Sequence, residues 1–243
     1  MKRVYMFLII LLFGCICWSN TSVYAMRISG FETEEMSMND IESFLDNINL
    51  FLVNTEPSQK PIKCFDANAQ GMIAIGTEDG NNKAIAIYSD NGSFQYGYRF
   101  QTEGSYGIEL NNEELKIYFV RNDVAISISI SGELKNVSRI CDTPENNTYW
   151  NRYVRATSRN KGEYVYALKN DVGILGIFAS SYSQLYRIDS LGNEQLIYNA
   201  NSFQFFNILI MFLGILVFVC IVVIVIIKEF KKLQRENCNN CKR

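Results

Sequence analysis

The sequence GMIAIGTEDGNNKAIAIYSDNG, residues 71–92, contains two short runs of alternating apolar residues, Met72 to Ile75 and Ala84 to Tyr88. Turn residues close each run, and the second is followed by Asn91-Gly92. Alternation with a period of two, bounded by Gly, Asn and Asp, is typical of antiparallel strands joined by tight turns. This stretch therefore predicts a β-hairpin, and the question is whether the hairpin recurs along the chain.

The same pattern of alternating apolar runs and turn residues continues on both sides of this stretch. The first predicted unit has strands Ile62 to Phe65, Met72 to Ile75, Ala84 to Tyr88 and Phe94 to Phe100. The second has strands Gly107 to Leu110, Leu115 to Val120, Val124 to Ile128 and Leu134 to Ile140. The third has strands Arg152 to Ser158 and Glu163 to Leu168, then strand material ending in LYRIDSLGNEQLIY, residues 185–198. The hairpin therefore recurs, imperfectly, three times.

A glycine precedes the final strand of each unit, in IYSDNGSFQY (87–96), ISISGELKN (128–136) and YRIDSLGNEQ (186–195). Over residues 62–198 this pattern resembles the WD-like and NHL-like repeats of β-propellers in bacterial surface proteins. The resemblance implies a mainly β fold of about three four-stranded antiparallel blades. Propellers close with four or more blades, so either the sheets form an open fan or a homodimer completes the ring. A plain antiparallel sandwich would show the same alternation.

A helical pattern precedes the strands, in SMNDIESFLDNINLFL, residues 37–52. Its apolar residues recur at intervals of three and four, which predicts one helix over about 39–50 with Ser37 or Asn39 as its N-cap. A short strand is expected between this helix and Pro57.

Apolar runs lie near both ends of the chain. Lys2-Arg3, the run Val4 to Trp18 and the small residue Ala25 indicate a secretory signal peptide over residues 1–25. An uncleaved anchor and a lipid-modified Cys15 are the alternatives.

The second run, Ile208 to Ile227, has 20 residues without a charge, enough for a helix to cross a bilayer. Basic residues follow it, which marks the cytoplasmic side. Residues 1–25 carry +2 and residues 206–243 carry +4, so the total of −2 leaves −2 − 2 − 4 = −8 for residues 26–205. We expect a single-pass protein of the cell membrane whose acidic middle is extracytoplasmic.

The predicted organisation is a signal peptide (1–25), a helical or linker segment (26–61), a β-meander extracytoplasmic domain (62–205), a transmembrane helix (206–228) and a basic cytoplasmic tail (229–243). Abundant Asn, Ile, Lys and Tyr with no His favour a bacterial source. Cys64 and Cys141 either form one disulfide or remain two buried free thiols. Cys238 and Cys241 supply half of a zinc site and are interpreted as a solvated reduced pair.

The absence of histidine excludes Ser-His-Asp and Cys-His catalysis and His-ligated zinc. No phosphate-binding or dinucleotide-binding glycine pattern occurs, and the nearly balanced charge argues against nucleic acid, so we expect no cofactor. DANAQG, residues 66–71, resembles the first half of a calcium loop, with oxygens on Asp66, Asn68 and Gln70. A β-turn explains the same residues.

TYWNRY, residues 148–153, places aromatic and basic residues in what we expect to be an irregular loop. Tyr149, Trp150, Arg152 and Tyr153 are therefore the candidate contacts for a partner, although aromatic residues also pack in cores.

The sequence favours a membrane-anchored, non-enzymatic module that binds an unknown protein or cell-envelope component. One alternative is an accessory subunit of a membrane complex, associated through its helix near Gly214 and Cys220. Another is a carboxylate-based, glycan-active enzyme using acids such as Asp123 or Asp171.

Overall fold

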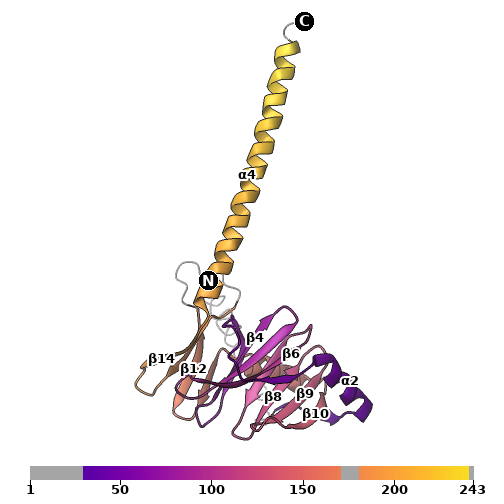
Figure 1. The fold of residues 1–243 in the computed structure, drawn as a ribbon, viewed down its shortest axis with the longest axis vertical. Helices are drawn as coiled ribbons and strands as arrows, with labels where there is room; N and C mark the ends of the chain where they lie inside the picture. The colour runs from indigo at the N-terminus through magenta and orange to yellow at the C-terminus, as the bar shows by residue number, and fades with distance from the viewer. Residues whose placement is uncertain (1–29, 171–180, 241–243) are drawn as a thin grey trace, which may run out of the picture. The chain divides into compact units, whose positions relative to one another are not determined.

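The computed structural model describes residues 30–170 and 181–240, with the backbone alone for residues 229, 230 and 232–240. The described chain forms three antiparallel sheets followed by one long apolar helix (Figure 1). This confirms the prediction of a mainly β fold with a C-terminal helix of membrane-spanning length.

Each sheet contains a meander of four consecutive strands, and in the first two sheets a short strand from earlier in the chain pairs with the last strand of the meander. The first has the order β2-β6-β5-β4-β3, with β2 Phe51–Val53, β3 Ile62–Ala67, β4 Ile73–Asp79, β5 Asn82–Tyr88 and β6 Phe94–Gln101. The second has the order β1-β10-β9-β8-β7, with β1 Thr33–Glu35, β7 Tyr106–Leu110, β8 Glu114–Phe119, β9 Val124–Ser129 and β10 Leu134–Ile140. The third has the order β11-β12-β13-β14, with β11 Ser158–Lys161, β12 Tyr164–Lys169, β13 Gln184–Ile188 and β14 Glu194–Asn199.

The closing hairpin has the same hydrogen bonds in all three sheets. Its glycine N–H donates to the carbonyl three residues earlier, and that earlier residue's N–H donates to the carbonyl four residues further on. The glycines Gly92, Gly132 and Gly192 have φ of +84°, +92° and +84°, a region that residues with a Cβ rarely adopt. The predicted turn glycines therefore occupy positions whose backbone conformation requires them.

The first sheet lies between the other two. Ile85 and Ile87 on one face pack in a core shared with the second sheet, whereas Ile73 and Ile75 on the other face pack with the third. Burial on both faces explains why β4 and β5 are more continuously apolar than ordinary surface strands.

Helix α2, Met38–Ile48, covers one edge of the core between the first and second sheets. Of the two predicted N-cap residues, Ser37 is the cap: its hydroxyl accepts a hydrogen bond from the N–H of Asp40 at 3.2 Å, whereas Asn39 lies within the helix. The helix buries Phe44 and Ile48, and the Phe44 ring meets that of Phe119 edge-on at 5.1 Å between centroids.

The prediction of a strand over Arg152 to Ser158, and of an irregular loop over residues 148–153, was wrong. Helix α3, Pro144–Tyr149, runs directly into a π-helical turn, η1, Trp150–Val154. Tyr149 and Val154 pack on Tyr118 and Ala125, on the face of the second sheet opposite to α2. A helix places these side chains on one surface, which a strand of period two would not do.

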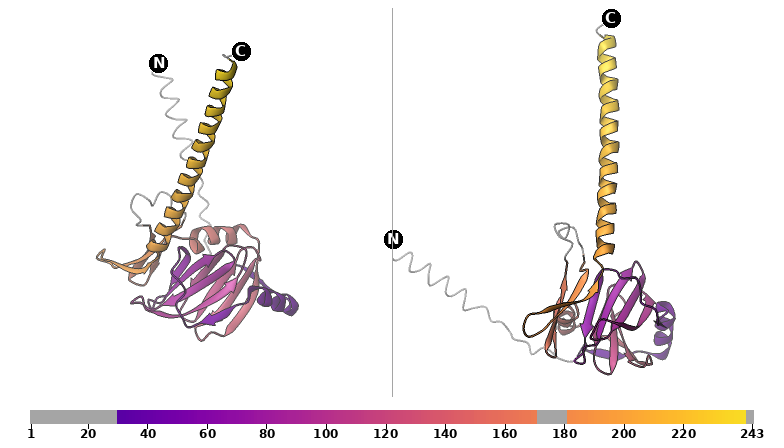
Figure 2. Two further views of the ribbon diagram at one scale, coloured as in Figure 1. Left: turned by 45° about the horizontal axis from the view of Figure 1, so that its top comes forward. Right: turned by 60° about the vertical axis from the view of Figure 1, so that its left-hand side comes forward.

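Helix α4, Asn201–Asn240, follows β14 with only Ala200 between them (Figure 2). Its segment Asn201–Lys228 is long and apolar enough to cross a membrane. The helix thus begins before the predicted span of 206–228 and continues through most of the predicted tail. The expected signal peptide and Cys241 lie outside the described residues.

The cysteines of the β domain do not pair. Cys64 is buried in the core between the first two sheets, whereas Cys141 follows β10 and is half-buried. Of the two alternatives, the structure has free thiols. Burial raises the pKa of the Cys64 thiol to about 12, so this group is not a reactive nucleophile at neutral pH.

Candidate functional site

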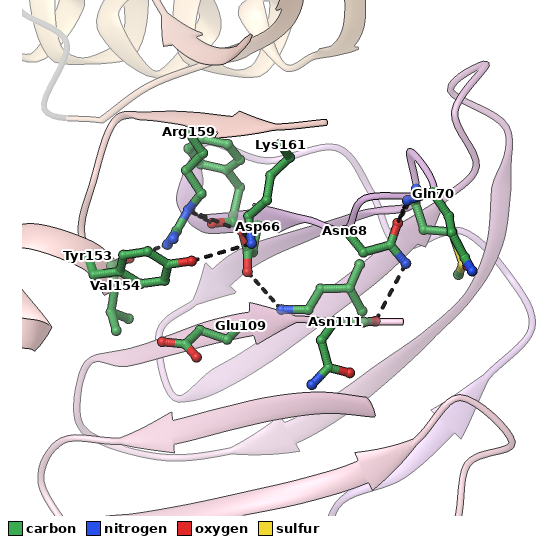
Figure 3. Close-up of polar contacts among 12 residues, drawn as sticks. Asp66, Asn68, Gln70, Glu109, Asn111, Tyr153, Val154, Arg159 and Lys161 are labelled. Carbon is green, nitrogen blue, oxygen red and sulfur yellow. Dashed lines mark hydrogen bonds and ion pairs between the residues drawn. The ribbon is translucent and has the colours of Figure 1, made fainter. Parts of the chain in front are cut away.

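The edge strand β3 of the first sheet lies beside β7 of the second sheet and β11 of the third, and these strands bring charged side chains into contact. Asp66 of β3 is almost fully buried, with 1% of its side chain exposed. Its Oδ2 accepts a hydrogen bond from the N–H of Leu110 in β7 at 2.9 Å. Its Oδ1 lies 3.4 Å from Arg159 Nε and 3.4 Å from Lys161 Nζ, both in β11 (Figure 3). One carboxylate therefore connects all three sheets.

Arg159 fills the space around this carboxylate. Its Nε donates to the carbonyl of Phe65 at 3.0 Å, and its Nη2 donates to the carbonyl of Val154 at 3.1 Å. The guanidinium lies over the Tyr153 ring, 4.7 Å from the centroid. Nη1 is buried without a hydrogen-bond partner among the described residues. A buried cation with this many partners is held in one place, and it ties β3 to η1.

Glu109 of β7 forms the next layer of the cluster. Its carboxylate accepts a hydrogen bond from the Tyr149 hydroxyl at 2.5 Å. Burial raises the pKa of the Glu109 carboxyl above its usual value, and the negative charge of Asp66 acts in the same direction. The Tyr149 and Tyr153 rings stack, with 5.1 Å between centroids and 18° between planes. Tyr149 and Tyr153 therefore pack against the buried charged groups.

We call Asp66, Glu109, Tyr149, Tyr153, Arg159 and Lys161 the central cluster. Two of its members, Tyr149 and Tyr153, belong to the predicted contact residues. Tyr149 is buried and Tyr153 is half-buried, as is Trp150, whereas Arg152 is exposed. The structure thus gives Tyr149 a packing role, and contact between this segment and a partner stays a prediction.

The calcium-like sequence DANAQG forms a turn stabilised by Asn68. The side-chain oxygen of Asn68 accepts hydrogen bonds from the N–H groups of Gln70 at 3.0 Å and Met72 at 2.9 Å. This is the turn geometry that Asn favours, and it uses the oxygen that a metal would need. In the part of the chain that the structure describes, no three His, Cys, Asp or Glu residues are grouped to hold a metal ion.

Asp123, one of the acids proposed for catalysis, is not part of this cluster. Asp123 lies in the turn between β8 and β9 with φ of +51°, a conformation that Asp tolerates in turns. Asp171 lies outside the described residues.

A second polar region is a cleft of about 500 Å³ on the first sheet, which we call the Arg99 cleft. Its lining combines residues of β2, β4, β5 and β6 with the C-cap residue of α2 and the segment that precedes β3: Asn49, Phe51, Pro57, Ser58, Lys60, Thr77, Glu78, Asp79, Asn82, Lys83, Ala84, Arg99, Phe100 and Gln101. Arg99 lies on β6, next to the edge strand β2, directly opposite Phe51 of β2 and Ala84 of β5.

Most charges of the cleft are paired. Glu78 lies 2.7 Å from Lys63 and 3.0 Å from Lys83, and Lys60 lies 2.5 Å from Asp79. Although burial opposes it, the hydrogen bonds and charges of Lys63 and Lys83 lower the pKa of the Glu78 carboxyl. Arg99 is exposed, and it forms no ion pair within the described residues.

No family model matches the chain, and neither the curated proteins nor the solved structures provide a match. Function must therefore be inferred from these two regions and from the helix. Sequence reasoning missed Glu109, Arg159, Lys161 and Arg99, because each occurs as an ordinary charged residue within or next to a strand. A signal existed for Glu109, a charged residue between the apolar residues Ile108 and Leu110, both of which are buried. Arg159 gave no such signal, because its neighbours Ser158 and Asn160 are polar and exposed.

Proposed function

We propose that this chain is a membrane-anchored, extracytoplasmic binding module without enzymatic activity. The observation that carries the proposal is the junction between β14 and α4. The side chain of Gln204 donates a hydrogen bond to the carbonyl of Ser181 at 2.9 Å, and the Ser183 hydroxyl donates to Asn201 at 2.5 Å. With only Ala200 as a connection, the sheets are held at the end of the span and not on a flexible linker.

The arrangement of the sheets supports a blade-like fan. In each sheet four consecutive strands start at the central cluster, with β3, β7 or β11, and end with the same glycine hairpin. A second copy that completed a ring would need the outer face of the second sheet, which α3 and η1 cover. We therefore propose that the fan works as a single copy, and a dimeric mass of the full chain in detergent, measured by light scattering, would contradict this.

The segment Trp150–Tyr153 is the surface proposed to contact an external protein or envelope component. Arg152 is exposed, and Trp150 beside it is half-buried. Below them Tyr149 is fixed to Glu109, so the segment presents its side chains from a rigid support. Trp and Arg on such a support are the residue types that dominate binding energy at protein interfaces.

Cysteine labelling tests the orientation. In a chain carrying Cys141→Ser and Asn91→Cys, a membrane-impermeant maleimide should label Cys at position 91 in intact cells, because this turn is exposed. Cys238 and Cys241 should react only after the cells are permeabilised. The reverse pattern would place the sheets in the cytoplasm and refute the proposal.

Crosslinking tests the contact surface. A photoreactive residue at position 152 should give a discrete adduct in cells, whereas the same residue at Asp46, exposed on α2, should not. Equal adducts from both positions would contradict a specific surface. Replacing the span of α4 by an unrelated apolar helix should leave the adduct intact. Its loss would instead favour an accessory subunit that associates through Gly214 and Cys220.

A further inference from the structure

One residue of the Arg99 cleft, Lys60, contacts the first turn of α4. Lys60, on the wall of the cleft, has its ammonium 5.6 Å from the centroid of the Phe203 ring and 2.5 Å from Asp79. Phe203 precedes Ile208, the first residue of the uncharged apolar run, by five residues. With the uncharged run from Ile208 placed in the hydrocarbon, a rise of 1.5 Å per residue puts Phe203 about 7.5 Å outside it. The headgroup layer of one leaflet is roughly 5–8 Å thick, so this wall of the cleft lies at headgroup depth.

The charge of the cleft differs from that of the domain around it. Residues 26–205 carry a net charge of −8. The cleft lining contains three cations, Lys60, Lys83 and Arg99, and two acids, Glu78 and Asp79, for a net charge of +1. A locally basic cleft on an acidic domain selects an anion at this position.

Among the charged groups of the cleft, Arg99 is the one that forms no ion pair within the described residues. The lysines meet acids within the sheet, whereas the guanidinium of Arg99 has no acidic partner among the described residues. A planar guanidinium matches the oxygens of a phosphate and binds them in a bidentate way. The ring of Phe51, 47% exposed on the adjacent strand, adds an apolar wall beside it.

We propose that the Arg99 cleft binds the phosphate of a phospholipid headgroup from the membrane that α4 spans. The inference rests on the proposed function, because it requires that α4 crosses a bilayer. Free phosphate shares the same chemistry, and the headgroup depth of Lys60 favours the lipid. A bound headgroup gives the domain a second point of attachment besides α4 and so limits how far the sheets can tilt.

The test uses the full chain, purified in mild detergent with phosphatidylglycerol, and counts retained lipid by native mass spectrometry. Arg99→Gln should retain about fivefold less lipid, the effect of one cation near an anionic surface. Asp79→Asn removes an acid from the cleft and should retain at least as much lipid as the unmodified chain. Arg152→Gln removes an exposed arginine elsewhere and should change nothing.

Equal retention by the unmodified chain and Arg99→Gln would overturn the proposal. A second arm follows inorganic phosphate by ³¹P line broadening in lipid-free detergent. Binding of phosphate at Arg99 without any retention of lipid would assign the cleft to a free anion and also overturn it. Cysteine labelling separates failure of the proposed function from failure of this inference. If the chain is not anchored in the membrane as proposed, the labelling pattern reverses or vanishes, whatever lipid the cleft retains.

Discussion

The central cluster and the Arg99 cleft both combine arginine, lysine and acids on neighbouring strands, but their arginines differ in surroundings. Arg159 is buried and has a carboxylate, two carbonyls and two aromatic rings around it. Arg99 is exposed and forms no ion pair within the described chain. A buried charge must be compensated inside the protein. The first arginine is therefore explained by the fold, whereas the second points outward to a ligand.

The largest expected effect comes from breaking the buried pair. Arg159→Met should destabilise the chain by about 3–5 kcal/mol, because it leaves Asp66 buried with Lys161 as the one cation paired with it among the described residues. The double variant Asp66→Asn/Arg159→Met should recover part of this loss. Chemical denaturation of the full chain in detergent, followed by near-UV circular dichroism, measures both. A loss below about 1 kcal/mol for the single variant would mean that the cluster does not hold the sheets together.

The next effect concerns the packing of η1 on Gly107 of β7. Gly107→Ala should cost about 1–3 kcal/mol, since its Cβ would lie 2.2 Å from Val154 Cγ1 and 2.8 Å from the Trp150 ring. Gly192→Ala is the control, because it has φ of +84° but nothing within 4 Å of a Cβ, and should cost about 1 kcal/mol. Equal losses in thermal unfolding would show that η1 is not packed tightly on β7.

A smaller effect tests whether the cluster is optimised for stability. The pKa of Glu109 is raised above its ordinary value of 4.5, so its favourable contribution is complete below pH 4.5 and is lost as pH rises through the shifted pKa. Glu109→Gln removes the buried charge and keeps an acceptor for Tyr149. It should raise stability at pH 7 by up to about 1 kcal/mol and leave stability at pH 4 nearly unchanged. A loss of stability at pH 7 would show that the ionised carboxylate is needed.

Local patterns predicted the local structure well. The strand Leu134–Ile140 has the bounds expected from alternation, and the Ser37 cap follows from its position before a helical pattern. The segment Trp150–Val154 was misassigned because its apolar residues fit either period over so few positions. The strands β1 and β2 have three residues each, which is too short to show a period at all.

Neither polar region could be read from the sequence. Asp66 bonds to Leu110, 44 residues away, and pairs with Arg159 in another sheet. These contacts depend on how the sheets pack, which local patterns do not encode. Arg99 has no feature that separates it from other strand arginines until Phe51 and Lys60 are placed around it by the fold.

Within the cleft, Glu78 provides a test of its paired charges. Because Lys63 and Lys83 lower its pKa below 4.5, its stabilising contribution is present above pH 4.5 and is lost as pH falls through the shifted pKa. Glu78→Gln should therefore cost about 0.5–1 kcal/mol at pH 7 and flatten the loss of stability on acidification. An unchanged acid transition would mean that these ion pairs contribute nothing, and the cleft would then resemble an ordinary surface.

The smallest effect on stability is expected at Arg99, and it decides the comparison. Arg99→Gln removes an exposed side chain without an acidic partner in the described chain, so the free energy of unfolding should change by less than about 0.5 kcal/mol. The same change should lower lipid retention about fivefold. A large loss of stability would mean that Arg99 has a structural partner, like Arg159, and would remove the reason for assigning it to a ligand. Unchanged stability with reduced lipid retention would show that Arg99 serves lipid binding, whereas Arg159 stabilises the fold.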